Sequence, residues 1–205
     1  MKNKTTTIKA VSKAESCVPL LHHIRRYVPL SDDEASLLLD SIHFKIVNSK
    51  AFLLQAGQVC GGNYFIVNGC FRMYLNTDYG TEQIIQFGID NWWIADYTSF
   101  EQQRPSDRFI QAVEKSSVIV MEKKEQDVLF QKLPQLERYF RIVFQRAYTA
   151  QLNRIHFMLN LSGEERYYHF HNSFPDFVQR VPQYMLASYL GFTPEFLSKV
   201  RAKRG

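Results

Sequence analysis

The chain has 205 residues, which is enough for one large or two small domains. Its content of 45% hydrophobic and 14% aromatic residues excludes a disordered chain, and its net charge of +5 is modest. No apolar run approaches the ~20 residues of a membrane span, and the N-terminus lacks the apolar segment of a signal peptide. We therefore expect a cytoplasmic protein that does not bind membranes.

The first part of the chain gives few structural signals. Residues 1–25 are expected to form a polar N-terminal segment, of which residues 1–18 are mobile. Ser31 and Glu34 have the spacing of a capping box, which predicts a short helix that ends near Ile42.

Between Phe44 and Met121 the pattern changes to short apolar runs separated by glycines. Asn68-Gly69 and the segment Asp78–Gly80 are typical of turns, because Asn and Gly tolerate positive φ. Many short strands indicate an antiparallel jelly roll, which we assign to a domain over residues 26–132. The predicted strands are Phe44–Asn48, Ala51–Gln55, Asn63–Asn68, Cys70–Asn76, Glu82–Phe87, Phe109–Glu114 and Ser117–Glu122.

Helical patterns return after Met121. Lys123–Lys132 is predicted to be a short helix, and Pro134 opens a long one that ends near Leu159. A helix of about 26 residues is roughly 39 Å long, which exceeds what a small sandwich can cover. We therefore predict a dimerisation helix over residues 133–160, while packing on its own domain is the alternative.

The segment 161–205 is predicted to be a helix-turn-helix domain. Ser162 and Glu165 form a second capping box, which starts a helix over 164–171. Pro182 can occupy the first turn of the next helix, and Gly191 ends that helix where positive φ is needed. The apolar side chains Leu186, Ala187 and Leu190 share one face of this helix.

The last helix begins at Thr193, a good N-cap, followed by Pro194. Leu197 and Val200 are predicted to face inward. From residue 180 onward the charge is strongly basic, which suits phosphate binding. The charged residues there are Arg180, Lys199, Arg201, Lys203 and Arg204 against Glu195 alone. An ordinary helical hairpin with a solvated basic end is the alternative.

In this order, the three parts resemble the Crp/Fnr superfamily of bacterial transcription regulators. The most specific phrases are Ala187-Ser-Tyr-Leu-Gly191 and Leu197-Ser-Lys-Val-Arg201. Further phrases are Tyr64–Gly69 with Arg72, Trp92–Phe100, Ile110–Glu114 and Glu164–Tyr167. The resemblance implies an α+β chain with an N-terminal jelly roll of the cyclic-nucleotide-binding type, a dimerisation helix and a C-terminal helix-turn-helix. It also implies a homodimer that binds a partly palindromic operator in double-stranded DNA, and contact with RNA polymerase.

The sequence departs from the pattern of members that bind cyclic AMP. The Gly-Glu and Arg-Ser pairs that hold the phosphate in those members fall on Ala95-Asp96 and Ser106-Asp107. Without the arginine there is no charge-assisted fork for the phosphate, so we expect no response to cyclic AMP. The N-terminal cysteine cluster of iron–sulfur members is missing, and the sequence ends at Gly205, so we expect no wing after the recognition helix.

By position, the base-reading residues of the family fall on Glu195 and Lys199. Glu can accept from cytosine N4 and Lys can reach guanine O6 or N7, but Lys lacks the bidentate fork of Arg. A surface ion pair between the two is the alternative. The residues expected to contact DNA are Gln183, Thr193, Pro194, Glu195, Ser198, Lys199, Arg201 and Lys203.

A ligand pocket for an unknown small-molecule effector is a further hypothesis, with the sandwich core as the alternative fate of its aromatic residues. Its candidate residues are Trp92, Trp93, Asp96, Tyr97, Phe100, Arg104 and Arg108. Because the strand region contains no histidine, a cupin-type metal enzyme is excluded, and we expect no enzyme activity, cofactor or metal. A jelly-roll receptor whose terminal helices dock a protein is the alternative to a DNA-binding regulator.

Overall fold

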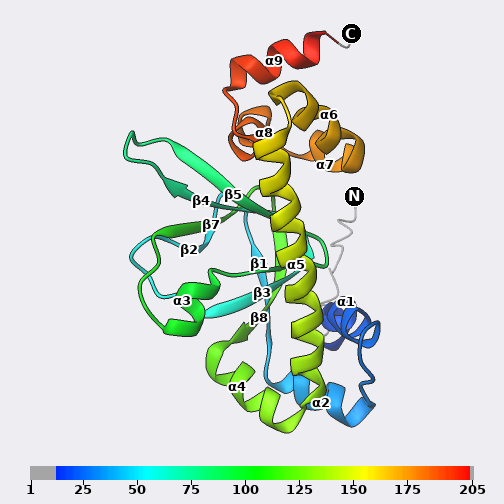
Figure 1. The fold of residues 1–205 in the computed structure, drawn as a ribbon. Helices are drawn as coiled ribbons and strands as arrows, with labels where there is room; N and C mark the ends of the chain where they lie inside the picture. Colours follow the sequence, from blue (N-terminus) through cyan, green and yellow to red (C-terminus); the bar gives the residue numbers. More distant parts are fainter. Residues whose placement is uncertain (1–12, 204–205) are drawn as a thin grey trace, which may run out of the picture.

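A computed structural model describes residues 13–203 (Figure 1). A β sandwich lies beside one long helix, and a group of shorter helices covers one end of both. The helices are α1 (Lys13–Arg25), α2 (Asp32–Asp40), α3 (Tyr97–Gln102), α4 (Lys123–Lys132), α5 (Gln135–Asn160), α6 (Gly163–Ser173), α7 (Pro175–Arg180), α8 (Gln183–Leu190) and α9 (Pro194–Ala202). The strands are β1 (His43–Val47), β2 (Phe52–Leu54), β3 (Gly62–Asn68), β4 (Cys70–Asn76), β5 (Glu82–Ile89), β6 (Trp93–Ile94), β7 (Arg108–Ala112) and β8 (Ser116–Glu122).

Two four-stranded antiparallel sheets form the sandwich, in the orders β1-β8-β3-β6 and β2-β7-β4-β5. Phe71 and Met73 of one sheet meet Ile66 and Val118 of the other in a fully buried core. At Gly69, where φ is +125°, an added Cβ would lie 2.8 Å from the Ser116 Cα, so the turn between β3 and β4 requires glycine. The predicted jelly roll is confirmed, with strand ends within two residues of those expected; β6 and α3 are additional elements.

Helix α1 belongs to the folded body, which corrects the expectation of a polar segment up to residue 25. Cys17, Leu20 and Ile24 are at most 1% exposed and pack with residues of the sandwich and of α5. Their spacing of three and four residues places them on one face of a helix, and that burial outweighs the polar residues around them. The predicted mobility of residues 1–12 lies outside the described residues.

Helix α5 confirms the predicted long helix, and its two halves differ in environment. Near its start, Leu136, Tyr139 and Phe140 are buried against the sandwich. Farther along, Tyr148, Ile155 and Leu159 are 66%, 52% and 80% exposed. The second half therefore carries an uncovered apolar stripe. Within residues 13–203, no helix combines the length and the apolar character that a membrane crossing needs.

The C-terminal helices pack against the outer face of the β4–β5 sheet. Cys70, Tyr74 and Phe87 of those strands share a buried cluster with Phe177 of α7 and Leu186 of α8. Both capping boxes are present as predicted, at Ser31 before α2 and at Ser162 before α6. The helix-turn-helix is therefore held in position by its packing against this sheet.

Candidate nucleic-acid interface

Helices α8 and α9 form a helix-turn-helix at the end of the molecule opposite α2 (Figure 1). Gly191 ends α8 at a φ of +76°, a left-handed conformation that glycine adopts without strain. The N–H of Phe192 then donates to the Ala187 carbonyl at 2.9 Å, which closes the turn. Pro182 is the residue before α8 rather than part of its first turn, one position earlier than predicted.

The start of α9 is fixed by local chemistry. Thr193 Oγ1 accepts from the Phe196 N–H at 3.2 Å, and Pro194 occupies the first turn. Leu197 is fully buried and Val200 is 2% exposed, so the inner face of α9 is held against the domain. The opposite face is consequently presented to solvent in a fixed orientation.

All eight residues expected to contact DNA occupy exposed positions. Gln183 is in the first turn of α8, and the other seven belong to α9 or to the residues at its two ends. They are Gln183, Thr193, Pro194, Glu195, Ser198, Lys199, Arg201 and Lys203. The fold thus brings them to one end of the molecule. Arg204 and Gly205, and with them the expected lack of a wing, lie outside the described residues.

Lys203 and Glu195, like Thr193, also make contacts within the domain. Lys203 Nζ lies 2.8 Å from Glu164 Oε2 at the start of α6. The pKa of Glu195 is lowered by its own backbone N–H and by the Thr193 hydroxyl. A carboxylate at the N-terminus of α9 therefore stays ionised and able to accept a hydrogen bond.

Arg180 is not part of the exposed basic surface, which corrects its grouping with the phosphate-binding residues. Its Nη1 lies 2.6 Å from Asp90 Oδ2, and its Nε donates to Glu114 Oε1 at 2.8 Å. Both carboxylates belong to turns of the sandwich, and they raise the pKa of Arg180. Arg180 therefore connects α7 to the sandwich.

Strand β5 and helix α8 are joined by direct hydrogen bonds. Ser188 Oγ accepts from the Ile84 N–H and donates to the Glu82 carbonyl, both at 2.9 Å. Arg154 of α5 donates to the carbonyls of Ile85 and Tyr189, at 2.7 and 2.8 Å. One arginine therefore ties the long helix, the sandwich and the helix-turn-helix together.

Asp96 and Ser106 belong to the two residue pairs that align with the phosphate-binding pairs of cyclic-AMP-binding members. In this chain, polar side chains of the protein itself contact one another at these positions, which we call the cassette. Asp96 is 2% exposed, caps α3 by accepting from the Thr98 N–H at 3.2 Å, and accepts from Ser106 Oγ at 2.6 Å. Arg108 Nη1 lies 3.2 Å from Asp96 Oδ1. The arginine next to the cassette thus neutralises an internal carboxylate, and Arg104 is exposed.

The candidate pocket residues do not line one cavity. Trp92 and Trp93 line a cleft of about 770 Å³ between the sandwich, α5 and the C-terminal helices. Phe100 is fully buried in the sandwich core, and Tyr97 donates to Asn63 Oδ1 at 3.0 Å. Asp96, Tyr97, Phe100, Arg104 and Arg108 do not line this cleft.

Cys17, Cys60 and Cys70 are all buried. Burial raises the pKa of Cys60, and that of Cys70 to about 12, which disfavours the reactive thiolate. Within residues 13–203, no group of three or more His, Cys, Asp and Glu side chains is arranged to hold a metal ion.

Comparisons with known proteins agree with this architecture. The family described as "Cyclic nucleotide-binding domain" matches residues 45–132. No curated protein matches the sequence. Several solved structures have a similar fold at low sequence identity.

The regulator CLP of Xanthomonas campestris, described as responsive to c-di-GMP, is 14% identical over 84% of this chain and 91% of its own, with a TM-score of 0.66. A Crp/Fnr-family regulator of Eubacterium rectale is 13% identical over 87% of both chains, with a TM-score of 0.67. A CooA mutant from Carboxydothermus hydrogenoformans is 16% identical over 81% of this chain and 77% of its own, with a TM-score of 0.64.

Jelly roll, long helix and terminal helix-turn-helix together give this chain the fold of these solved structures. Residues 45–132 are similar to members of the cyclic nucleotide-binding domain family.

The residues that join the C-terminal helices to the sandwich are not among those predicted from the sequence. Ser188 and Arg154 make these contacts, and Arg146 and Arg166 line the cleft. Arg146 and Arg154 are eight residues apart on one face of α5, which is the available sequence signal. That spacing shows a shared face but not what the face packs against.

Proposed function

We propose that this chain is a sequence-specific DNA-binding transcription regulator that acts as a homodimer and not as an enzyme. The exposed outer face of α9, fixed from behind by Leu197 and Val200, is the observation that carries the proposal. A short helix held this way can enter the major groove of double-stranded DNA. Such a role requires a cytoplasmic location.

The roles of individual α9 residues follow from their exposure and chemistry. Lys199 can reach guanine O6 or N7, and ionised Glu195 can accept from cytosine N4. Arg201 and Thr193 are assigned contacts with the phosphates that flank the groove, which position the helix without reading sequence. Gln183 and Ser198 are assigned supporting contacts, and Pro194 a steric one.

The apolar stripe on α5 supports the homodimer. Tyr148, Leu152, Ile155 and Leu159 are exposed and follow one another at intervals of four, three and four residues. This spacing is that of a coiled-coil seam. Two protomers joined there would relate their α9 helices by two-fold symmetry, which calls for a partly palindromic operator. A surface for RNA polymerase is part of the same proposal.

We also propose that cyclic AMP is not the effector. Asp96 already accepts hydrogen bonds from Ser106 and α3 and pairs with Arg108. A cyclic phosphate would have to displace these contacts and lie beside a buried carboxylate. Repulsion between the two anions opposes that binding.

DNA binding tests the proposal directly. Fluorescence anisotropy with labelled duplex is measured over a salt series for wild type, Lys199→Ala and Arg201→Ala. We expect steep salt dependence for wild type. Arg201→Ala should make the slope of log affinity against log salt concentration less steep by about one. Lys199→Ala should mainly lower the preference for a selected operator over random duplex.

The matched control is Lys132→Ala, at the end of α4 far from α9 (Figure 1). It should leave both the affinity and the slope unchanged. If wild type binds no duplex at low salt, the terminal helices dock a protein instead and the DNA-binding proposal is wrong. If Lys199→Ala matches wild type in footprinting, the assigned reader is wrong.

A further inference from the structure

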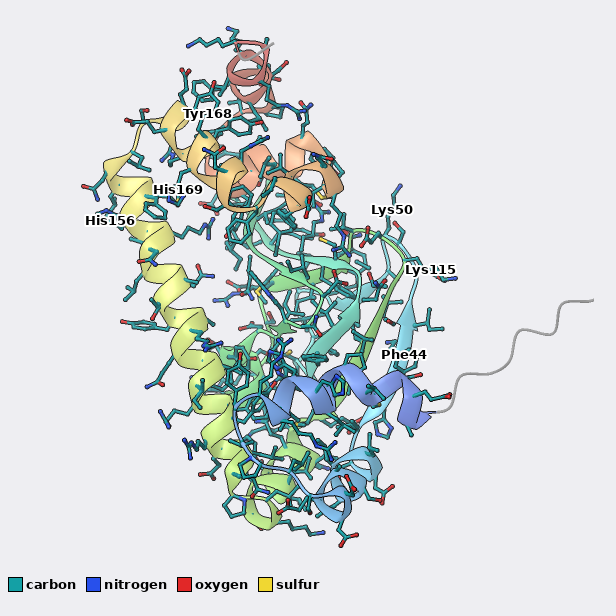
Figure 2. All side chains as sticks on the ribbon, turned by 90° about the vertical axis from the view of Figure 1, so that its right-hand side faces the viewer. Phe44, Lys50, Lys115, His156, Tyr168 and His169 are labelled. Carbon is teal, nitrogen blue, oxygen red and sulfur yellow. The ribbon has the colours of Figure 1, made fainter. Side chains whose placement is uncertain are left out.

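The cleft beside α5 lies where the two domains meet. Its walls come from α5, from the end of β5 and the Trp92–Trp93 segment, and from α6, α7 and α8. Figure 2 shows one of its lining residues, His169 of α6, at the junction with α5. Its volume of about 770 Å³ falls in the range of small-molecule sites, roughly 300–1,000 Å³.

Positive charge in this cleft is not balanced by the residues around it. Arg146, Arg154 and Arg166 line it, and its lining contains no Asp or Glu. Among the ion pairs of residues 13–203, none includes any of these three arginines. Three cations that share a cleft without a carboxylate favour an anionic ligand.

The arginines make neutral hydrogen bonds instead. Arg146 Nη1 donates to Tyr27 Oη at 2.6 Å, and Arg166 Nη1 donates to the Met158 carbonyl at 2.9 Å. Arg166 Nε is buried and has no hydrogen-bond acceptor. Each guanidinium is thus held in place by neutral groups, and each also lies over an aromatic ring, that of Tyr27, Tyr189 or Phe192.

Aromatic side chains make up much of the remaining wall. Trp92 is 45% exposed, and Phe174 is 43% exposed. Phe157 also lines the cleft and packs against His169 with ring centroids 4.1 Å apart. Aromatic walls favour a ligand with a flat ring system, because aromatic rings offer a large contact area and pack in offset-stacked or edge-to-face arrangements.

Several of the α5 residues that line the cleft lie away from the exposed stripe. At about 100° per residue, Ala150, Arg154 and Phe157 lie roughly 120–180° around the helix from Tyr148. Ala147, Gln151 and Met158 also line the cleft and lie roughly 60–100° from Tyr148, so the cleft extends toward the stripe along one side of α5. The cleft is separate from the cassette around Asp96, which does not line it.

We propose that this cleft binds a small molecule with an aromatic body and at least one anionic group, such as a carboxylate, sulfonate or phosphate. Arg146 and Arg154 receive the anion, while Trp92 and Phe157 contact the ring system. The site goes beyond the proposed DNA-binding function and does not depend on it.

The probe is 1-anilinonaphthalene-8-sulfonate, whose fluorescence rises in apolar surroundings. N-phenyl-1-naphthylamine has the same ring system without the sulfonate and serves as the neutral comparison. Both are titrated into the folded full-length protein without DNA. We expect saturable binding of the anion with about one site per chain, and at least tenfold weaker binding of the neutral probe.

Variants locate the site. Arg146→Gln should weaken binding of the anion about tenfold and change binding of the neutral probe less than twofold. Arg138→Gln, an exposed arginine of α5 outside the cleft, should change neither. Ala150→Trp should block both probes by filling the cleft, and Thr149→Trp on another face of α5 should not.

Equal affinity for the two probes, or equal effects of Arg146→Gln and Arg138→Gln, would overturn the proposal. So would binding that Ala150→Trp leaves intact. Circular dichroism and thermal melting confirm that each variant is folded, so a lost signal reports the site. Because DNA is absent, these outcomes are independent of whether α9 binds DNA.

Discussion

Arg180 and Asp90 form an ion pair across the boundary between the helix-turn-helix domain and the sandwich, with Nη1 2.6 Å from Oδ2. Asp90 Oδ1 also accepts from the Gly69 N–H at 2.7 Å, so the same carboxylate secures the turn between β3 and β4. Burial raises the pKa of Asp90, but hydrogen bonds from Arg180 and from the Gly69 N–H, together with the positive charge of Arg180, outweigh burial and lower that pKa overall. The orientation of α9 is therefore linked to the turns of the sandwich through α7.

Arg180→Met should weaken this connection and lower the free energy of unfolding by about 2 kcal/mol, because charged hydrogen bonds to Asp90 and Glu114 are lost. The free energy of unfolding of Arg180→Lys should lie between those of wild type and Arg180→Met. Lysine keeps the positive charge but lacks the guanidinium group that donates to both carboxylates. Urea unfolding measures both. The control Arg25→Met removes an ion pair to fully exposed Asp32 and a hydrogen bond to the Leu30 carbonyl, and it should cost less than Arg180→Met because solvent screens the pair. Equal losses in Arg180→Met and Arg25→Met would contradict the role assigned to Arg180.

Tyr139→Phe should destabilise the junction of α1, β6 and α5. Trp93 Nε1 donates to Tyr139 Oη at 2.7 Å, and Tyr139 Oη lies 2.7 Å from His23 Nδ1. Removing the hydroxyl leaves the buried Trp93 N–H without an acceptor, which costs about 1–3 kcal/mol. Tyr64→Phe is the control, because its hydroxyl only donates to the Leu53 carbonyl at 3.2 Å. Thermal melting should show the larger decrease for Tyr139→Phe; a smaller one would count against this network.

Stability should fall as the solution becomes acidic, in part because of His23. Burial, followed by the positive charges of Arg26 and Arg146, lowers the pKa of His23. The unfolded chain therefore binds this proton more readily, and the stabilisation present above about pH 6.5 is lost as the pH falls toward the folded pKa. Urea unfolding at pH 7.5 and 5.5 should show a smaller difference for His23→Gln than for wild type. His22→Gln, on the exposed side of α1, should keep the wild-type difference; if His23→Gln also keeps it, the account of His23 is wrong.

Glu164→Gln should strengthen DNA binding. Glu164 pairs with Lys203 at 2.8 Å, and Lys203 follows the last turn of α9. Removing the carboxylate frees a cation for phosphate, so affinity should rise about threefold and the salt slope should steepen by about one. Asp33→Asn in α2, at the far end of the molecule, makes the same charge change as a control (Figure 1). Anisotropy titrations that rank the two variants equally would show that Lys203 does not contact DNA.

The sequence was sufficient where local chemistry determines the structure. Gly191 needs positive φ, and Thr193 and Pro194 start a helix whatever surrounds them. Capping at Ser31 and Ser162 likewise depends on residues only three positions apart. The turn of the helix-turn-helix could therefore be located to the residue.

Features that depend on contacts between residues far apart in the chain were harder to predict from the sequence. Cys17, Leu20 and Ile24 show helical spacing, but their burial depends on Phe65 and Tyr139, far along the chain. Similarly, the basic character of Arg180 indicated phosphate, and only the fold places it next to two carboxylates. Strand β6 has two residues, too few for a periodic pattern to register.

Selection of bound duplexes from a random pool, at one fixed salt concentration, tests the central claim most directly. A dimer that presents two α9 helices should enrich a partly palindromic site whose half-site centres lie about 10–10.5 base pairs, or a multiple of that, apart. Lys199→Ala should lose that enrichment while it retains weak binding to any duplex. A pool that stays random after repeated selection by the folded wild-type protein would contradict the account.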